Sequence, residues 1–177
     1  GTPSVGPVTG SPLAAFDPAT NDRMTAVATT GTRIVSGAET HGEFVGSQLT
    51  EVGAAYVFER TGNSWQQVAK LLPSDRVLAG KFGHSVAADG DAIAVGAPHA
   101  TITATSASAQ GMEGGTVYVF ERIAGRWTET ARIASPSPAT TKAFGADVAL
   151  SGSTLVVGAP LHGGASPTGA VFVYTKD

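Results

Sequence analysis

Hydrophobic and polar residues alternate over short segments of this chain, and turns rich in glycine, proline and polar side chains separate the segments. In residues 117–120, two valines take one face of an extended strand while a tyrosine and a phenylalanine take the other. Residues 86–88 and 93–95 are apolar or small at every position, which is typical of strands covered on both faces by neighbouring sheets. The pattern carries no helical period of useful length and predicts an all-β fold.

The pattern also repeats along the chain. A spacing of 62 residues separates Gly83 from Gly145, Gly96 from Gly158, Val57 from Val119, and Trp65 from Trp127. A separation held at several landmarks is a structural period, so we expect three copies of one unit. The first copy is degenerate, because Arg23-Met24 stand where the later copies have Phe82-Gly83 and Phe144-Gly145.

Each unit is expected to contain four strands. In the second unit they are residues 84–89, 92–97, 117–120 and 127–133, and a tight turn at Gly90 joins the first two. The corresponding segments are 25–30, 32–38, 56–58 and 65–71 in the first unit, and 146–151, 154–159 and 171–174 in the third. The third unit therefore lacks a fourth strand.

The repeated residues resemble FG-GAP repeats, the blade unit of the integrin α-chain β-propeller and of many bacterial surface and secreted proteins. The resemblance is carried by Phe82-Gly83, Gly96-Ala97-Pro98, Phe144-Gly145, Gly158-Ala159-Pro160 and a Tyr-Val-Phe strand followed by tryptophan. It implies a β-propeller of four-stranded antiparallel blades, an extracellular or cell-surface location, and a role in adhesion or ligand binding.

Many FG-GAP repeats carry a calcium loop, Asp-x-Asp-x-Asp-Gly, between their first and second strands. Here that connection has shrunk to residues 30–32, 89–91 and 151–153, with two carboxylates in one turn and none in the others. Calcium takes six to eight oxygen ligands, so we expect no calcium in these turns. No metal and no cofactor is predicted for the chain. The chain resembles the calcium-free bacterial repeats, which often carry Phe-Glu-Arg before the tryptophan. In this chain the Phe-Glu-Arg segments contain Glu59-Arg60 and Glu121-Arg122, which are interpreted as pairs of solvated surface charges.

On this resemblance, residues 1–177 form a single propeller segment with three blades. Residues 23–75, 76–138 and 139–177 are the three blades, and residues 1–22 are an N-terminal closing strand and linker. Residues 11–18 resemble the end of the first blade's fourth strand, residues 68–73. We therefore predict that they supply the outer strand of a blade whose inner strands come from the C-terminal unit.

Three blades are too few for a closed ring, because propellers typically have four to eight. An open wedge would expose two apolar sheet faces, more than a soluble monomer tolerates. We expect completion to about six blades by a second copy, in a two-fold homodimer where each N-terminus finishes the partner's last blade. Completion by blades of another chain, or by a missing part of this protein, stays open as the alternative.

Composition narrows the functional classes. The chain has 42% hydrophobic and 14% charged residues with a net charge of −3, so it can bury a core and has no basic surface for nucleic acid. It lacks an apolar run long enough for a membrane span, a signal peptide, and any cysteine for disulfides or thiolate metal sites.

Candidate ligand-binding residues follow the second strand of each unit: His41, His99 and His162, together with Glu39. They lie in the variable loops 39–52, 99–114 and 161–168, which should emerge on one face. Metal binding is disfavoured, since Zn–N distances of about 2.0–2.1 Å cannot join equivalent positions on different blades. Exposed histidines with no role, and a polar or glycan ligand, both remain as interpretations.

Other candidate sites have simpler explanations. Phe82 and Phe144 are expected to wedge between blades, and Asp89-Gly90-Asp91 is expected to form a turn without pairing to His84. The chain has no Gly-x-Ser-x-Gly and no phosphate loop. The predicted function is a non-enzymatic surface or extracellular module for association with itself or another protein. A small carbohydrate-binding propeller is the alternative, and an enzyme using the propeller channel is a third.

Overall fold

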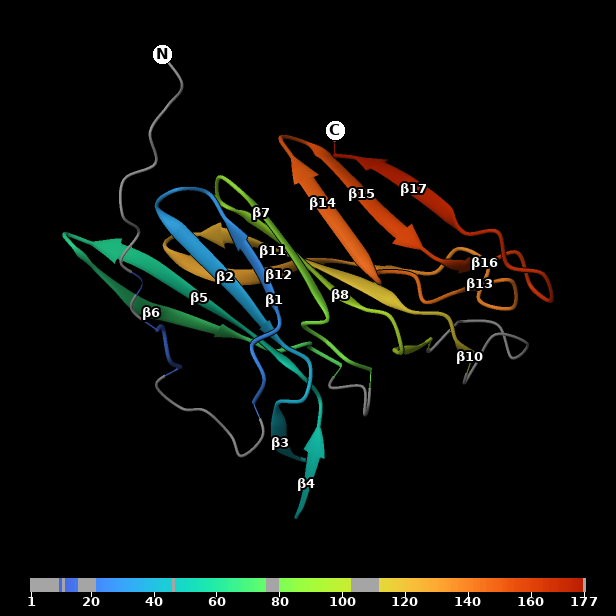
Figure 1. Ribbon diagram of the computed structural model, residues 1–177, viewed down its shortest axis with the longest axis horizontal. Helices are drawn as coiled ribbons and strands as arrows, with labels where there is room; N and C mark the ends of the chain where they lie inside the picture. The colour runs from blue at the N-terminus through green and yellow to red at the C-terminus, as the bar shows by residue number, and fades with distance from the viewer. Residues whose placement is uncertain are drawn as a thin grey trace.

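The computed structural model describes residue 10 and residues 12–15, 22–45, 47–75, 80–102 and 112–176. Within these residues every regular element is a β-strand, which confirms the predicted all-β fold. Three larger antiparallel sheets stand face to face in chain order, and three two-stranded sheets lie at one end of them (Figure 1). None of the described residues forms a helix that could cross a membrane.

The larger sheets are meanders in which each strand pairs with the next one of its unit. The first sheet contains β1 (Ala26–Thr29), β2 (Arg33–Ala38), β5 (Ala54–Thr61) and β6 (Ser64–Leu71). The second contains β7 (Ser85–Asp89), β8 (Ala92–Ala97), β11 (Thr116–Ile123) and β12 (Arg126–Ala134). The third contains β14 (Asp147–Ser151), β15 (Thr154–Ala159) and β17 (Ala170–Thr175).

The two-stranded sheets are formed by the segments that connect successive units or that connect the second and third strands of a larger sheet. They are β3 (Gly42–Val45) with β4 (Gln48–Glu51), β9 (Thr101–Ile102) with β10 (Met112–Glu113), and β13 (Thr141–Lys142) with β16 (Leu161–His162). Figure 1 shows them away from the tight turns that join β1 to β2, β7 to β8, and β14 to β15. The described parts of the loops predicted to vary therefore lie on one side of the molecule.

Strand register confirms the repeat. The second strand of each sheet carries a glycine opposite the first residue of the first strand: Gly37 opposite Ala26, Gly96 opposite Ser85, and Gly158 opposite Asp147. The pairing of third and fourth strands shifts at the same place in the first two sheets, between Val57 and Phe58 and between Val119 and Phe120. The predicted strands match the observed ones to within a few residues.

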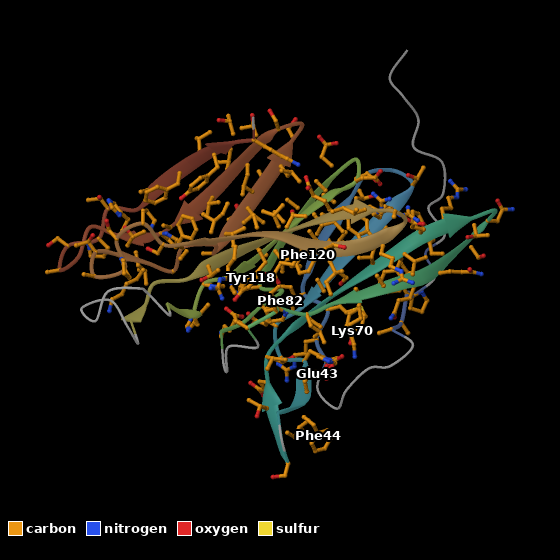
Figure 2. All side chains as sticks on the ribbon, turned by 180° about the vertical axis from the view of Figure 1, so that it is seen from behind. Glu43, Phe44, Lys70, Phe82, Tyr118 and Phe120 are labelled. Atoms are coloured by element: carbon orange, nitrogen blue, oxygen red, sulfur yellow. The ribbon has the colours of Figure 1, made fainter. Side chains whose placement is uncertain are left out.

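The core lies between successive sheets. Phe82 is buried between the first and second sheets, with its ring 5.2 Å from that of Tyr118 and 6.0 Å from that of Phe120 (Figure 2). Phe144 is buried in the same way between the second and third sheets. The prediction that these phenylalanines wedge between units is confirmed.

A tight turn brings each phenylalanine into place. Gly83 has φ +91° and Gly145 has φ +88°, a backbone conformation that favours glycine. The carbonyl oxygen of Gly83 lies 2.0 Å from where a Cβ on Gly37 would be, and that of Gly145 lies 2.1 Å from the same point on Gly96. The second strand of each preceding sheet therefore needs a glycine, since a side chain there would overlap the next turn.

The interpretation of Glu59-Arg60 as a solvated pair is wrong. Glu59 was expected to form a solvated pair with its neighbour Arg60, but its carboxylate binds Arg33 at 3.0 Å and Arg122 at 2.8 Å. The Arg33 guanidinium also lies 4.8 Å from the ring centre of Trp127. Because Arg122 and Trp127 belong to the second sheet, these charges join two sheets instead of facing water.

The N-terminal segment is described only in part. Residues 12–15 form no strand and lie against the first sheet, where Ala15 and Leu13 contact the cluster containing Tyr56 and Phe58. Residues 11 and 16–18 of the predicted closing strand lie outside the described residues. Among the described residues β17 pairs only with β15, so the completion of the third sheet by the N-terminus stays a prediction.

Candidate functional site

His41 is a buried network residue instead of an exposed loop residue. It is only 2% exposed, with Nδ1 2.9 Å from the Asp22 carboxylate and Nε2 2.9 Å from Glu43 Oε1. The Tyr56 hydroxyl donates to Asp22 at 2.7 Å and lies 3.2 Å from His41 Nδ1. The His41 carbonyl also accepts the amides of Val52 and Gly53 at 3.0 Å. The ring thus fixes the β3–β4 hairpin to the first sheet.

Glu43 joins this network to the outer strand. Its Oε1 accepts from Lys70 Nζ at 3.0 Å as well as facing His41, and Figure 2 shows Glu43 below Lys70, which lies at the lower edge of the first sheet. The hydrogen bond from His41 lowers the pKa of Glu43 below 4.5; burial opposes this effect and Lys70 adds to it. The carboxylate is therefore held in its charged form.

We expect Glu43→Gln to destabilise the protein at neutral pH, and the loss to disappear in acid. A carboxyl group whose pKa is lowered by folding stabilises the protein above its ordinary pKa, here 4.5, and stops doing so as the pH falls through the folded value. Urea unfolding of both proteins from pH 7 to pH 3 measures the difference. Glu51→Gln, at an exposed position on the same hairpin, is the control. A loss that does not depend on pH would contradict the account.

The other predicted ligand residues are dispersed. His99 is exposed, and His162 is half-buried with Nδ1 2.6 Å from Thr141 Oγ1 and its ring edge-on to Phe172. Glu39 faces neither of them. In the part of the chain that the structure describes, no cluster of His, Asp and Glu could hold a metal ion. The structure does not bring the three histidines and Glu39 together, and their ligand role stays a prediction.

Sequence reasoning missed the contact that Glu39 does make. Its carboxylate lies 2.5 Å from His84 Nδ1 and 4.0 Å from Lys81 Nζ, both on the turn that leads into the second sheet. Along the sequence, the acidic residues nearest to His84 are Asp89 and Asp91 of its own unit, whereas Glu39 belongs to the preceding unit. The signal was present, because Glu39 stands where Pro98 and Pro160 stand in the other Gly-Ala-Pro segments. We call the contact between two successive sheets a joint. An acidic residue at one joint and not at the others indicates a contact specific to that joint.

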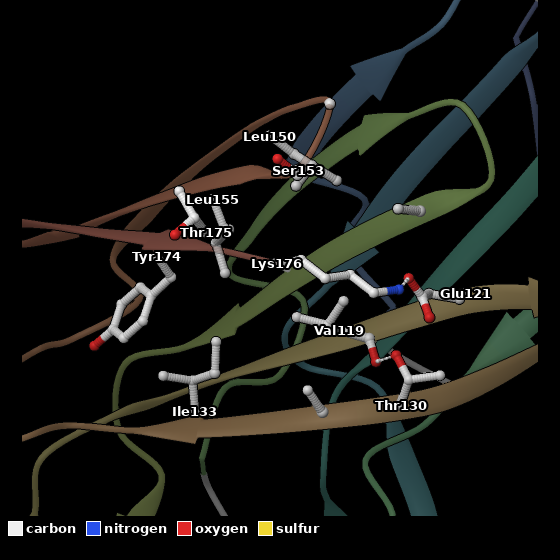
Figure 3. Close-up of a pocket in the computed structure, with 13 residues that line it drawn as sticks. Val119, Glu121, Thr130, Ile133, Leu150, Ser153, Leu155, Tyr174, Thr175 and Lys176 are labelled. Carbon is white, nitrogen blue, oxygen red and sulfur yellow. Dashed lines mark hydrogen bonds and ion pairs between the residues drawn. The ribbon is translucent and has the colours of Figure 1, made fainter.

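An apolar cleft of about 490 Å³ opens between the second and third sheets. Its walls include Val119, Ile133, Leu155 and Tyr174, and an ion pair between Lys176 and Glu121 at 2.5 Å closes one end (Figure 3). Burial raises the pKa of the Tyr174 hydroxyl. The cleft is large and apolar enough to receive a hydrophobic side chain.

The cleft corresponds to a filled space at the preceding joint. There, Trp127 of the fourth strand packs against the core and over Arg33. Ala92 lines the cleft at the register position of Arg33, since Arg33 lies opposite Glu59 and Ala92 lies opposite Glu121. The described residues of the third sheet include no fourth strand. The cleft is therefore where the first side chains of such a strand would pack.

The outer face of the third sheet is apolar and uncovered. Val171 and Val173 are 68% and 64% exposed. Val171 lies opposite Gly158, just as Val117 lies opposite Gly96, yet Val117 is buried by the sheet that follows it. An open pocket of about 520 Å³ beside Val171, Gly158 and Asp147 occupies the position that the next turn fills at the other joints. The third sheet thus has the form of an interface without an occupant.

The first sheet is also incomplete on the face that points away from the second. Val27 is 73% exposed, although Val86 at the same register position of the second sheet is buried. Tyr56 and Phe58 on this face are buried, because residues 12–15 and neighbouring side chains cover them. The two ends of the array therefore differ: one is bare and the other is partly covered.

Comparison with known proteins agrees with these repeats. A family model described as the FG-GAP repeat matches residues 65–120 and 127–174, which together make up more than half of the chain. Each match begins at the tryptophan of a fourth strand and continues into the next sheet. A comparison with curated proteins found none that matches the chain.

Proposed function

Because this chain belongs to the FG-GAP repeat family, we propose that it is a non-enzymatic β-propeller module that works outside the cell or on its surface by associating with other proteins. FG-GAP repeats are consistent with a β-propeller, are typical of extracellular proteins, and form a family that is generally non-enzymatic. Association is the finer step, and it is supported by the sheets at the two ends of the array.

The observation that carries the proposal is the exposed face of the third sheet. Exposed valines occur singly on many soluble proteins, but Val171 and Val173 lie two residues apart on the same face of β17, and Val171 borders an open pocket. Their register equivalents in the second sheet face a further sheet. A face built like an internal joint is best explained by a partner that covers it.

Hydrogen exchange at different protein concentrations tests this proposal. If the outer face of the third sheet is covered by association, the amides that pair β17 with β15 exchange more slowly in concentrated protein and faster on dilution, because the partner suppresses local opening of the strand. The amides of β8, in the middle of the second sheet, serve as the internal control because sheets of the same chain cover both faces of that strand. Exchange of β17 that is fast at every concentration, in the protein alone and with candidate partners, would contradict the proposal.

A further inference from the structure

The third sheet has open space beside Gly158 that no other sheet of the described chain fills. Gly37 and Gly96 each lie under a carbonyl of the following turn, at distances that leave no room for a Cβ. Gly158 occupies the same register position, but the atoms nearest to its missing Cβ belong to Asp147 of its own sheet, at 3.5 Å and beyond. The backbone of another sheet could therefore approach Gly158 as closely as Gly83 approaches Gly37.

The same joint carries a new charge on the third sheet. At the second joint, Ser85 Oγ donates a hydrogen bond to the Gly145 carbonyl at 2.8 Å. Asp147 takes the register position of Ser85 and is exposed; among the described residues it accepts only the amide of Val148, at 3.0 Å. A carboxylate cannot donate to a carbonyl as serine does. This change favours a cationic group on whatever covers the third sheet.

The first sheet carries the matching charge. Arg23 precedes β1 by the same number of residues as Phe82 precedes β7, so it stands where the other units place their wedge. Its backbone amide donates to Thr40 at 3.3 Å, while its side chain is exposed and makes no ion pair with the described residues. The two departures from the repeat, Arg23 and Asp147, thus lie on the two sheets that have no neighbour in this chain, and their charges are opposite.

We propose that the open face of the third sheet receives the first sheet of a second copy of this chain, with Arg23 of one copy facing Asp147 of the other. Two such contacts, related by a two-fold axis, close a ring of six sheets, which is within the usual range for propellers. This proposal rests on the proposed function and names the partner. Val171 and Val173 then pack against the first sheet of the second copy, as Val117 packs within one chain.

The position of the N-terminal segment supports the same contact. Ala69 and Leu71, at the end of a fourth strand, lie in the cluster that covers Tyr118 and Phe120 of the next sheet. Leu13 and Ala15 lie in the same way on Tyr56 and Phe58 of the first sheet. When the first sheet docks on the third sheet of another copy, this segment comes beside the free edge of β17. It can then complete the third sheet as a fourth strand.

A separate FG-GAP blade with its own Phe-Gly turn is the competing occupant. A second copy cannot supply such a turn, because Phe82 and Phe144 are both buried at the joints of their own chain. The carbonyl of that turn would, however, face the carboxylate of Asp147 with no hydrogen between them. Arg23 removes this conflict, so the second copy is favoured.

A charge exchange tests the contact in the full chain. We expect Arg23→Glu and Asp147→Lys each to weaken self-association by at least roughly tenfold, since like charges face each other at the joint. The double variant R23E/D147K restores most of the affinity, because the charges are again opposite. Sedimentation equilibrium over a range of protein concentrations measures the dissociation constants. Arg126→Glu, at an exposed position on the β11–β12 hairpin of the second sheet, should leave them unchanged.

Gly158→Val adds a second, uncharged test. The valine makes only ordinary contacts with Asp147 of its own sheet and meets no other sheet of the described chain, so circular dichroism should show an unchanged fold, while self-association is lost. If neither the charge changes nor Gly158→Val alters self-association, the proposed contact is wrong, although a general role in association is not contradicted. A wild-type chain that does not self-associate would overturn the contact outright. If that chain instead binds an added FG-GAP blade through Asp147 and Gly158, the competing occupant is correct.

Discussion

Replacing Phe144 with alanine is expected to lower the free energy of unfolding by about 3–5 kcal/mol. The side chain is fully buried between the second and third sheets, with its ring 5.5 Å from that of Phe172 and 6.2 Å from that of Tyr174. Removing the ring leaves a cavity and ends both edge-on contacts, which are worth more than their buried area alone. Urea unfolding followed by circular dichroism measures the loss.

Phe44→Ala is the matched control for this prediction. Phe44 is the same residue type but is 70% exposed on the β3–β4 hairpin, away from the three sheets (Figure 2). Its replacement should change the free energy of unfolding by no more than about 0.5 kcal/mol. Equal losses for Phe44 and Phe144 would show that the wedge between sheets does not hold the fold together.

Gly96→Val is expected to be as damaging, through overlap instead of a cavity. The added Cβ would lie 2.1 Å from the Gly145 carbonyl oxygen and 2.2 Å from Ser85 Oγ, so the turn before the third sheet must move away. Overpacking typically costs 1–3 kcal/mol, and a collision with backbone atoms should place this variant at about 3 kcal/mol or more. Thermal and urea unfolding measure the effect.

Gly158→Val provides the comparison at the same register position. Its new side chain meets no following sheet within one chain, so the isolated chain should lose no more than about 0.5 kcal/mol. The measurement is made at concentrations below the dissociation constant, where self-association does not contribute. If both valines destabilise the chain equally, the glycine is needed for the strand itself and not for the approach of the next sheet.

The repeat could be predicted from sequence because its signals are local. Glycines at Gly90 and Gly152 mark turns, and alternating residues such as those of 117–120 mark the strand between two packed faces. The spacing of Phe82 and Phe144 then predicted the wedge between sheets. Each of these features depends on neighbouring residues along the chain and on the pleat of a strand, so the pattern alone was sufficient.

The polar contacts could not be predicted because they join distant parts of the chain. His41 is buried by Asp22 and Glu43, which meet only when the β3–β4 hairpin folds back against the first sheet. Glu59 reaches Arg122, which lies one whole unit further along the chain. No period marks such pairs, since each occurs at a single joint. Departures from the repeat, such as Glu39 for proline, are the signal that could have located them.

The central claim is that the outer faces of the first and third sheets are covered by a second copy of the chain. The particle mass in solution, measured by sedimentation equilibrium at several concentrations, tests it most directly. We expect a mass of twice the 17.7 kDa of one chain, falling toward a single chain on dilution. A particle of one chain that stays soluble and folded at high concentration would contradict the claim.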